Sequence, residues 1–272
     1  MKPSECPVIK IVITNMQNHQ KFTVSDGTDV ALYIQRVEEL KTFFKQGHYS
    51  RVYFGVEFCE SMFPSCREIQ DVAEFCRDHD IGFTLVTPYV SDKGIHKLEP
   101  VFEMLGREMA GCEIVINDFG VLQMLEESRK PFTRILGRIL ARQKKDPRIN
   151  LVRDSGMRNY FAKNVCDNIS YCEFLTAQCI ERIELDNPLQ GTETGNGFRF
   201  SMYFPYVYLT TAGNCFVDTC AECVNYVFAL KNGAMGRNIL LKGKTQFYRN
   251  EDLSAFHHGK FDRLIHQVYP PY

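Results

Sequence analysis

The first half of the chain alternates between continuous apolar runs and segments whose apolar residues recur at helical spacing. The runs are rich in β-branched and aromatic residues, which predicts strands that are buried on both faces. The intervening segments place apolar residues three or four positions apart, which predicts amphipathic helices. The expected strands are 9–15, 51–59, 81–90, 112–118 and one that begins at 131, and the expected helices are 29–46, 65–78, 95–109 and 119–128.

The order of these elements predicts the fold class. Strands that alternate with helices over short connections favour right-handed βαβ units and a parallel sheet. The second half is less regular, with a helix expected at 155–166 and strands at 180–186, 198–211, 236–243 and 261–268. About eight strands in a chain of this length suit a (β/α)8 barrel that the last strand closes. We therefore expect an α/β, TIM-barrel-like single domain over residues 1–272, with a cysteine-bearing loop at 213–225.

Composition narrows the class of protein further. The net charge is −1, so no global field favours nucleic acid or a membrane. No apolar run approaches the roughly 18 residues that a membrane span needs, and the N-terminal stretch lacks the long apolar region of a signal peptide. We expect a cytoplasmic protein with no membrane span, whose 11 cysteines are thiols or metal ligands rather than disulfides.

The stretch CFVDTCAEC places Cys215, Cys220 and Cys223 in one loop after a strand. Packing explains three clustered loop thiols poorly, whereas metal ligation explains them well, and both zinc sites and iron–sulfur clusters favour four ligands. Cys59 ends an expected strand, and Cys66 is its competitor seven residues later. Barrel enzymes build their sites at the carboxyl ends of strands, so Cys59 is the expected fourth ligand.

Four other residues lie at or near the ends of expected strands, and each has two interpretations. Glu57 is either a rim carboxylate paired with an arginine or part of a site. Asn117 and Asp118 either cap the next helix or belong to the site. Arg138 opens the basic stretch 138–148, which is either a solvated basic face or a place where Arg138 holds an anionic substrate with both arms of its guanidinium.

Three segments resemble the collagenase-like peptidase family, and most closely its UbiU/UbiV branch. They are VYFGVEFC at 52–59, IVINDFGVLQML at 114–125 and GNCF at 213–216. The resemblance implies a TIM-barrel-like fold and a [4Fe–4S] cluster on four cysteines, one at the position of Cys59 and the others at Cys215 and the two thiols after it. Members of this branch act in oxygen-independent hydroxylation of the ubiquinone ring, and some family relatives modify RNA.

The function that follows is a redox enzyme of the oxygen-independent hydroxylase type, or a subunit of one, acting on an aromatic or nucleobase-like ring. Glu57, Asn117, Asp118 and Arg138 would serve catalysis. The alternatives are a non-catalytic, cluster-bearing subunit paired with a related barrel protein, a peptidase relative, and a zinc site in place of the cluster. The heterodimer alternative predicts an exposed apolar patch, with Tyr203, Phe204, Tyr206 and Tyr208 as candidates. RNA is a further candidate partner through the basic stretch, although that stretch lacks interleaved aromatic residues.

Overall fold

Eight parallel strands close into a barrel, as the sequence predicts. The computed structural model describes residues 11–15, 20–24, 27–213, 215, 220, 223, 227–232, 237–258 and 260–271. Around the barrel the strands follow the order β14 (Phe261–Gln267), β3 (Asp29–Ile34), β4 (Arg51–Gly55), β5 (Gly82–Val86), β6 (Glu113–Ile116), β7 (Thr133–Leu136), β8 (Ile180–Leu185) and β9 (Arg199–Phe204). Since β14 pairs in parallel with both β3 and β9, the predicted last strand does close the barrel.

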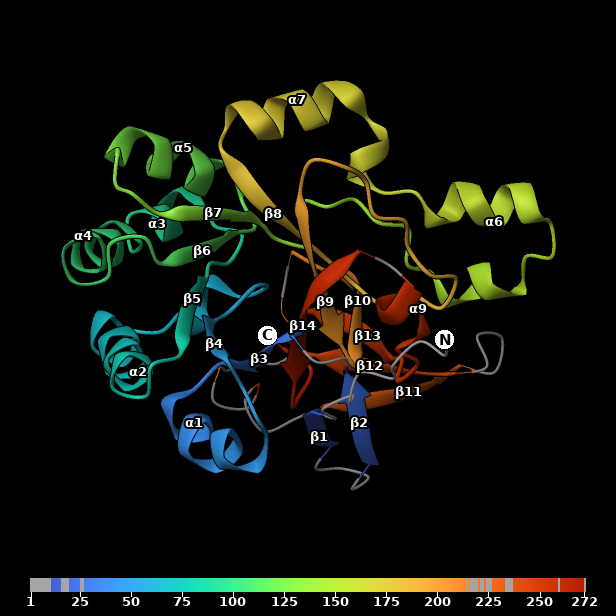
Figure 1. Cartoon of the computed structure of the whole chain (residues 1–272), viewed down its shortest axis with the longest axis horizontal. Coiled ribbons are helices and arrows are strands. Elements are labelled where there is room, and N and C mark those ends of the chain that lie inside the picture. Colours follow the sequence, from blue (N-terminus) through green and yellow to red (C-terminus); the bar gives the residue numbers. More distant parts are fainter. Residues whose placement is uncertain are drawn as a thin grey trace, which may run out of the picture.

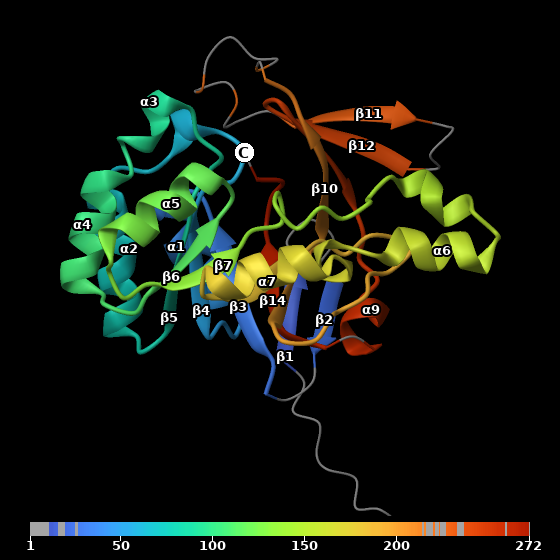
Figure 2. The ribbon, with the colours of Figure 1, turned by 90° about the horizontal axis from the view of Figure 1, so that it is seen from above.

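Helices lie around the outside of the barrel, and α6 projects away from it (Figures 1 and 2). They are α1 (Val37–Phe43), α2 (Cys66–Asp78), α3 (Asp92–Ile95), α4 (Glu99–Glu108), α5 (Phe119–Ser128), α6 (Ser155–Ala162), α7 (Ile169–Ala177) and α9 (Ser254–His258). In the part of the chain that the structure describes, none of the helices is both long and apolar enough to cross a membrane.

Local sequence explains why these helices form where they do. The Ser65 hydroxyl accepts from the backbone N–H of Glu68, whose carboxylate accepts from the Ser65 N–H, so α2 begins with a capping box. Its predicted apolar stripe is buried against the strands, and consists of Ile69, Val72, Ala73 and Cys76.

The first barrel strand corrects the sequence prediction. Residues 29–34 are strand β3 rather than the start of a helix, and only Val37–Phe43 is α-helical. Both faces of β3 are buried, because Val30, Leu32 and Ile34 pack against the outer helices while Ala31 and Tyr33 fill the barrel. The strand expected at 9–15 appears as β1 (Ile11–Asn15), which pairs with β2 (Gln20–Val24) outside the barrel.

A four-stranded antiparallel sheet is inserted between β9 and β14. Its order is β10 (Tyr206–Thr211), β13 (Thr245–Arg249), β12 (Arg237–Lys242) and β11 (Phe228–Asn232). The single strand expected at 198–211 divides at Pro205, which follows a cis peptide bond. The strand expected at 236–243 is β12, so it belongs to this inserted sheet and not to the barrel.

The inserted sheet covers the carboxyl ends of barrel strands. Tyr206 of β10 and Phe247 of β13 pack with Phe58, which follows β4, and with Ile139, which follows β7. In Figure 2 β11 and β12 lie at the far end of this sheet, away from the ring of helices. Tyr203, Phe204 and Tyr206 are buried in this arrangement, so the prediction that they form an exposed patch is wrong.

Candidate functional site

Cys59 lies where the chain leaves barrel strand β4. The segment after β4 carries Val56, Glu57 and Phe58 into the protein, and Cys59 then precedes a short 3-10 turn (Glu60–Met62). Burial raises the pKa of the Cys59 thiol, the backbone N–H groups of the turn oppose this, and the thiol of Cys220 adds to it. Cys220 therefore lies near enough to Cys59 to affect the charge of the Cys59 thiol.

The three loop cysteines lie between β10 and β11, beside Cys59. Cys223 is buried and packs with Val56, whereas Cys215 and Cys220 are exposed. Burial raises the pKa of Cys223 to about 11, and the thiols of Cys215, Cys59 and Cys220 shift it in the same direction. Two places 156 residues apart in sequence thus bring four thiols into one neighbourhood, which we call the cysteine site (Cys59, Cys215, Cys220 and Cys223).

The thiols of the cysteine site are neighbours without forming a closed ligand shell. Among the residues that the structure describes, no three His, Cys, Asp or Glu side chains are arranged to hold a metal ion. Cys66, the competing fourth ligand, opens α2 and packs against the main core. The donor set still fits an iron–sulfur cluster or zinc, since both bind thiolates.

Arg138 and Glu57, two of the expected catalytic residues, form a fully buried ion pair. Arg138 donates from Nε and Nη2 to the two Glu57 carboxylate oxygens at 2.9 and 2.6 Å, and from Nη1 to Asp186 at 2.8 Å. Burial alone would lower the pKa of Arg138, but the Glu57 and Asp186 carboxylates outweigh it and raise it. Arg138 therefore binds Glu57 with two of its nitrogens and Asp186 with the third, so protein carboxylates take the place of the expected anionic substrate.

Aromatic rings separate this ion pair from solvent. The Arg138 guanidinium lies 3.9 Å from the centre of the Tyr203 ring, and the rings of Phe58 and Phe247 cover it at 5.4 and 6.0 Å. The side chains of Arg138 and Glu57 are both completely buried. A role for Arg138 in holding an anionic substrate would thus require Glu57 to release the guanidinium and the inserted sheet to move.

Asn117 and Asp118 lie at the carboxyl end of β6, on the same side of the barrel. Asp118 caps α5, because its carboxylate accepts from the Gly120 N–H at 2.7 Å. Asn117 is buried and donates to the Thr87 carbonyl at 2.9 Å, while its side-chain oxygen has no hydrogen-bond partner within the described part of the chain. The capping reading of Asp118 matches this geometry, and a catalytic role for either residue stays a prediction.

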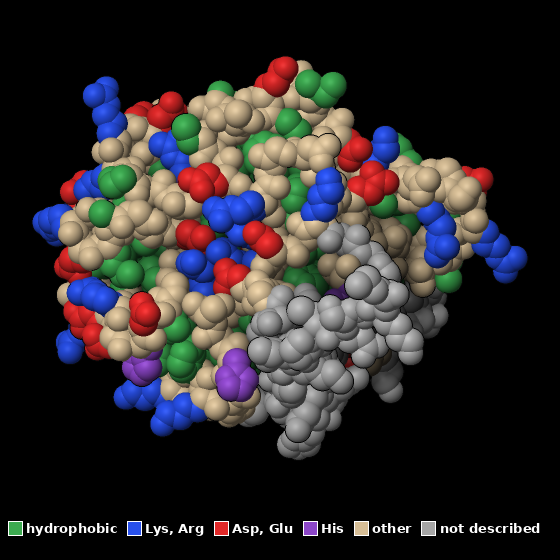
Figure 3. Space-filling model, viewed as in Figure 1, with side chains coloured by type: hydrophobic (Ala, Val, Ile, Leu, Met, Phe, Trp, Pro, Cys, Tyr) green, Lys and Arg blue, Asp and Glu red, His purple; other side chains and the backbone are tan. Residues whose placement is uncertain are grey.

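The basic stretch 138–148 is neither a uniform solvated face nor a single binding surface. Lys145 is buried and donates to Asp186 at 2.9 Å, beneath the ring of Tyr208. Arg142 and Lys144 lie over tyrosine rings, and Arg148 pairs with Asp146 at the surface. On the face that Figure 3 shows, Lys and Arg side chains are interspersed with Asp and Glu, so this view offers no extended basic area for RNA.

Sequence reasoning missed two acidic residues that the structure places in the barrel. Asp186 bridges Arg138 and Lys145, and Glu184 accepts from the Tyr203 hydroxyl at 2.6 Å. A signal was present, because Arg182, Glu184 and Asp186 occur at every second position of one strand and so share a face. All three are buried, and Glu184 points into the barrel, because its partner Tyr203 belongs to the apolar cluster inside the barrel while Ile183 and Leu185 pack in the outer core.

A prediction on pH follows from Glu184. Burial raises its pKa to about 8, from an ordinary value of 4.5. Between these values the folded chain binds a proton that the unfolded chain has released, so this group contributes less to stability as the pH rises through that window. Glu184→Gln removes the ionisation, and we expect the variant to lose less stability than the wild type between about pH 5 and pH 8. Urea unfolding at both pH values tests this, and identical pH dependence in the two proteins would contradict it.

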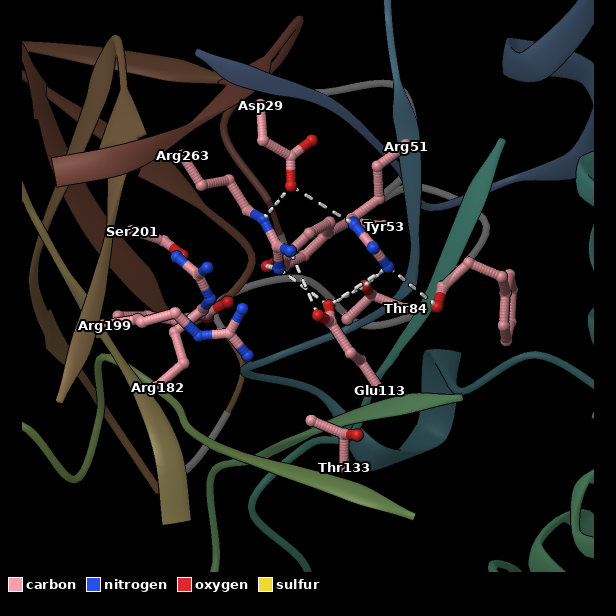
Figure 4. Close-up of polar contacts among 12 residues, drawn as sticks. Asp29, Arg51, Tyr53, Thr84, Glu113, Thr133, Arg182, Arg199, Ser201 and Arg263 are labelled. Carbon is pink, nitrogen blue, oxygen red and sulfur yellow. Dashed lines mark hydrogen bonds and ion pairs between the residues drawn. The ribbon is translucent and has the colours of Figure 1, made fainter. Parts of the chain in front are cut away.

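A second ion-pair network closes the opposite end of the barrel. Arg263 donates to both oxygens of Glu113 at 2.7 and 3.0 Å and to Asp29 at 2.6 Å. Figure 4 shows Arg51 pointing into the same group, where it donates to Thr84 and pairs with Glu113. These residues lie near the amino ends of their strands, where charged groups in barrels contribute to stability rather than to chemistry.

Comparisons with known proteins do not assign the chain to a family. No family model matches it, and no curated protein does. The solved structure of the U32 peptidase Mk0906 is similar with a TM-score of 0.49 and 12% identity, covering 93% of this chain and 98% of that one. Two structures of a class V chitinase from Nicotiana tobaccum have TM-scores of 0.35 and 0.34 at 8% identity, each covering 88% of this chain and 93% of the chitinase. At these values the likenesses carry no conclusion about activity.

Proposed function

We propose that this protein binds a [4Fe–4S] cluster at the cysteine site and takes part in redox chemistry of the oxygen-independent hydroxylase type. The observation that supports it is the approach of Cys59, from a barrel strand, to three thiols of a loop more than 150 residues later. A bound cluster would supply one-electron transfer. Cys215 and Cys220 are exposed, which supports a site that an electron donor or acceptor could approach from the surface. The ring hydroxylation itself rests on the sequence resemblance alone.

Side chains fill the carboxyl end of the barrel, which favours a second candidate function. In this candidate the protein is a cluster-bearing subunit that does not itself bind the substrate. In many barrel enzymes the substrate lies over the carboxyl ends of the strands. Here Phe58, Tyr208 and Phe247 fill the space above the Glu57–Arg138 pair. Co-purification with a related barrel protein, and turnover only in its presence, would favour this candidate over a self-sufficient hydroxylase.

The proposal predicts the metal content of the purified chain. Protein prepared without oxygen should be brown, with broad absorbance near about 400 nm and roughly four iron atoms per chain, as a cluster held by four cysteines requires. Iron and sulfide analysis with an absorbance spectrum measures this. A colourless protein with about one zinc per chain would contradict the cluster and indicate a structural zinc site, which four thiolates also accommodate.

A further inference from the structure

The turn between β12 and β13 lies directly against the cysteine site. Gly243 in this turn has φ +56°, and a Cβ atom built on it would lie 2.8 Å from the Cys223 sulfur and 3.6 Å from the Cys215 sulfur. Contacts under 3.0 Å are essentially never made by real Cβ atoms, so any larger residue at 243 would displace Cys223. A glycine at this point lets the backbone approach two thiols of the site.

Lysines stand on both sides of this glycine, so the turn that contacts the Cys223 and Cys215 sulfurs also brings two cations beside the cysteine site. Lys242 is buried. Lys244 is held in place, because its ammonium donates to the Tyr89 hydroxyl at 2.5 Å and lies 4.7 Å from the centre of that ring. The carboxylate of Glu60 lies close to Lys244 and carries the opposite charge.

The positive charges of Lys242 and Lys244 are opposite in sign to the net charge of the proposed cluster with its thiolate ligands. A doubly positive metal or cluster core held by four thiolates carries two net negative charges, and cations close to such a core stabilise its reduced, more negative form. We infer that the Lys242–Gly243–Lys244 turn is a functional part of the cysteine site, in which Gly243 makes room for the sulfur ligands and the lysines set the reduction potential. This inference rests on the proposed function.

Gly243→Ala tests the steric half of the inference. We expect iron to fall below roughly half of the wild-type content, because displacing one of four ligands opens the site. Gly111→Ala is the matched control, since Gly111 also has a positive φ (+85°) but nothing within 4 Å of its Cβ position. The iron content of Gly111→Ala should equal that of the wild type. Equal iron in both variants would overturn the steric claim.

Lys244→Met tests the electrostatic half. The variant should keep its iron and show a more negative reduction potential in an anaerobic redox titration, whereas Lys244→Arg, which keeps the charge, should stay close to the wild type. An unchanged potential in iron-loaded Lys244→Met would overturn the inference and leave the proposed function intact. A wild-type protein without iron would instead contradict the proposed function, so the two failures are distinguishable.

Discussion

Cys59→Ala should lose most of its iron and its brown colour when it is purified without oxygen. Cys59 is the proposed ligand that comes from the barrel, and three loop thiols alone leave one iron of a cluster without a protein ligand. Two matched controls carry the same substitution nearby. Cys66 packs against the main core at the start of α2, and Cys76 lies on the buried stripe of the same helix. Both variants should keep the wild-type iron content.

The outcome separates the alternatives at this site. If Cys66→Ala bleaches the protein and Cys59→Ala does not, the assignment of the fourth ligand is wrong and Cys66 replaces Cys59. If single alanine variants of all four cysteines of the cysteine site keep full iron, the site itself is wrong. Circular dichroism of each variant checks that a loss of iron is not a loss of folding.

Arg138→Ala should destabilise the protein strongly. The substitution leaves Glu57 and Asp186 buried without their shared cation, and breaking a buried pair in this way costs about 3–5 kcal/mol. That is a large fraction of the roughly 5–15 kcal/mol by which a domain is stable. Urea unfolding should therefore show a much lower midpoint. A wild-type midpoint together with lost activity would instead support the role of Arg138 in substrate binding.

Two further variants keep this prediction testable if Arg138→Ala does not fold. Arg148→Ala removes an exposed arginine that pairs with Asp146 at the surface, and its midpoint should not change. Glu57→Gln removes one of the two carboxylates around Arg138 and leaves Asp186, so it should lower the midpoint by less than Arg138→Ala. A midpoint equal to the wild type in Glu57→Gln would show that the ion pair contributes little.

The sequence pattern was enough for the barrel but ambiguous at its first strand. The strands expected in the first half are continuous apolar runs bounded by polar residues, and the structure confirms them as β4 to β7. The strand expected at 180–186 is also confirmed, as β8, although it contains charged residues. Residues 30–37 fit two periodicities, because Val30, Ile34 and Val37 recur at helical spacing within a run that is apolar at nearly every position. Burial on both faces of β3 decides between them, and that depends on the whole barrel rather than on the local sequence.

The inserted sheet and the buried ion pairs could not be predicted either, and the reason differs from the ambiguous periodicity of β3. Glu57 and Arg138 are 81 residues apart, and only the closed barrel brings them together. The cysteine loop follows a strand, as expected, but that strand is β10 of the inserted sheet and not a barrel strand. The place of Cys59 at the end of a strand was enough to expect it beside the loop, but the way the inserted sheet carries that loop over β4 follows from no local pattern.

The position of β14 in the barrel has a consequence for synthesis on the ribosome. Its partners β3 and β9 are made much earlier, and the whole inserted sheet is translated before β14. Until then, β3 and β9 each present an open edge, which is the kind of surface that pairs with other nascent chains. A chaperone that shields strand edges should therefore raise the yield of folded protein most when it acts before residues 261–267 leave the ribosome.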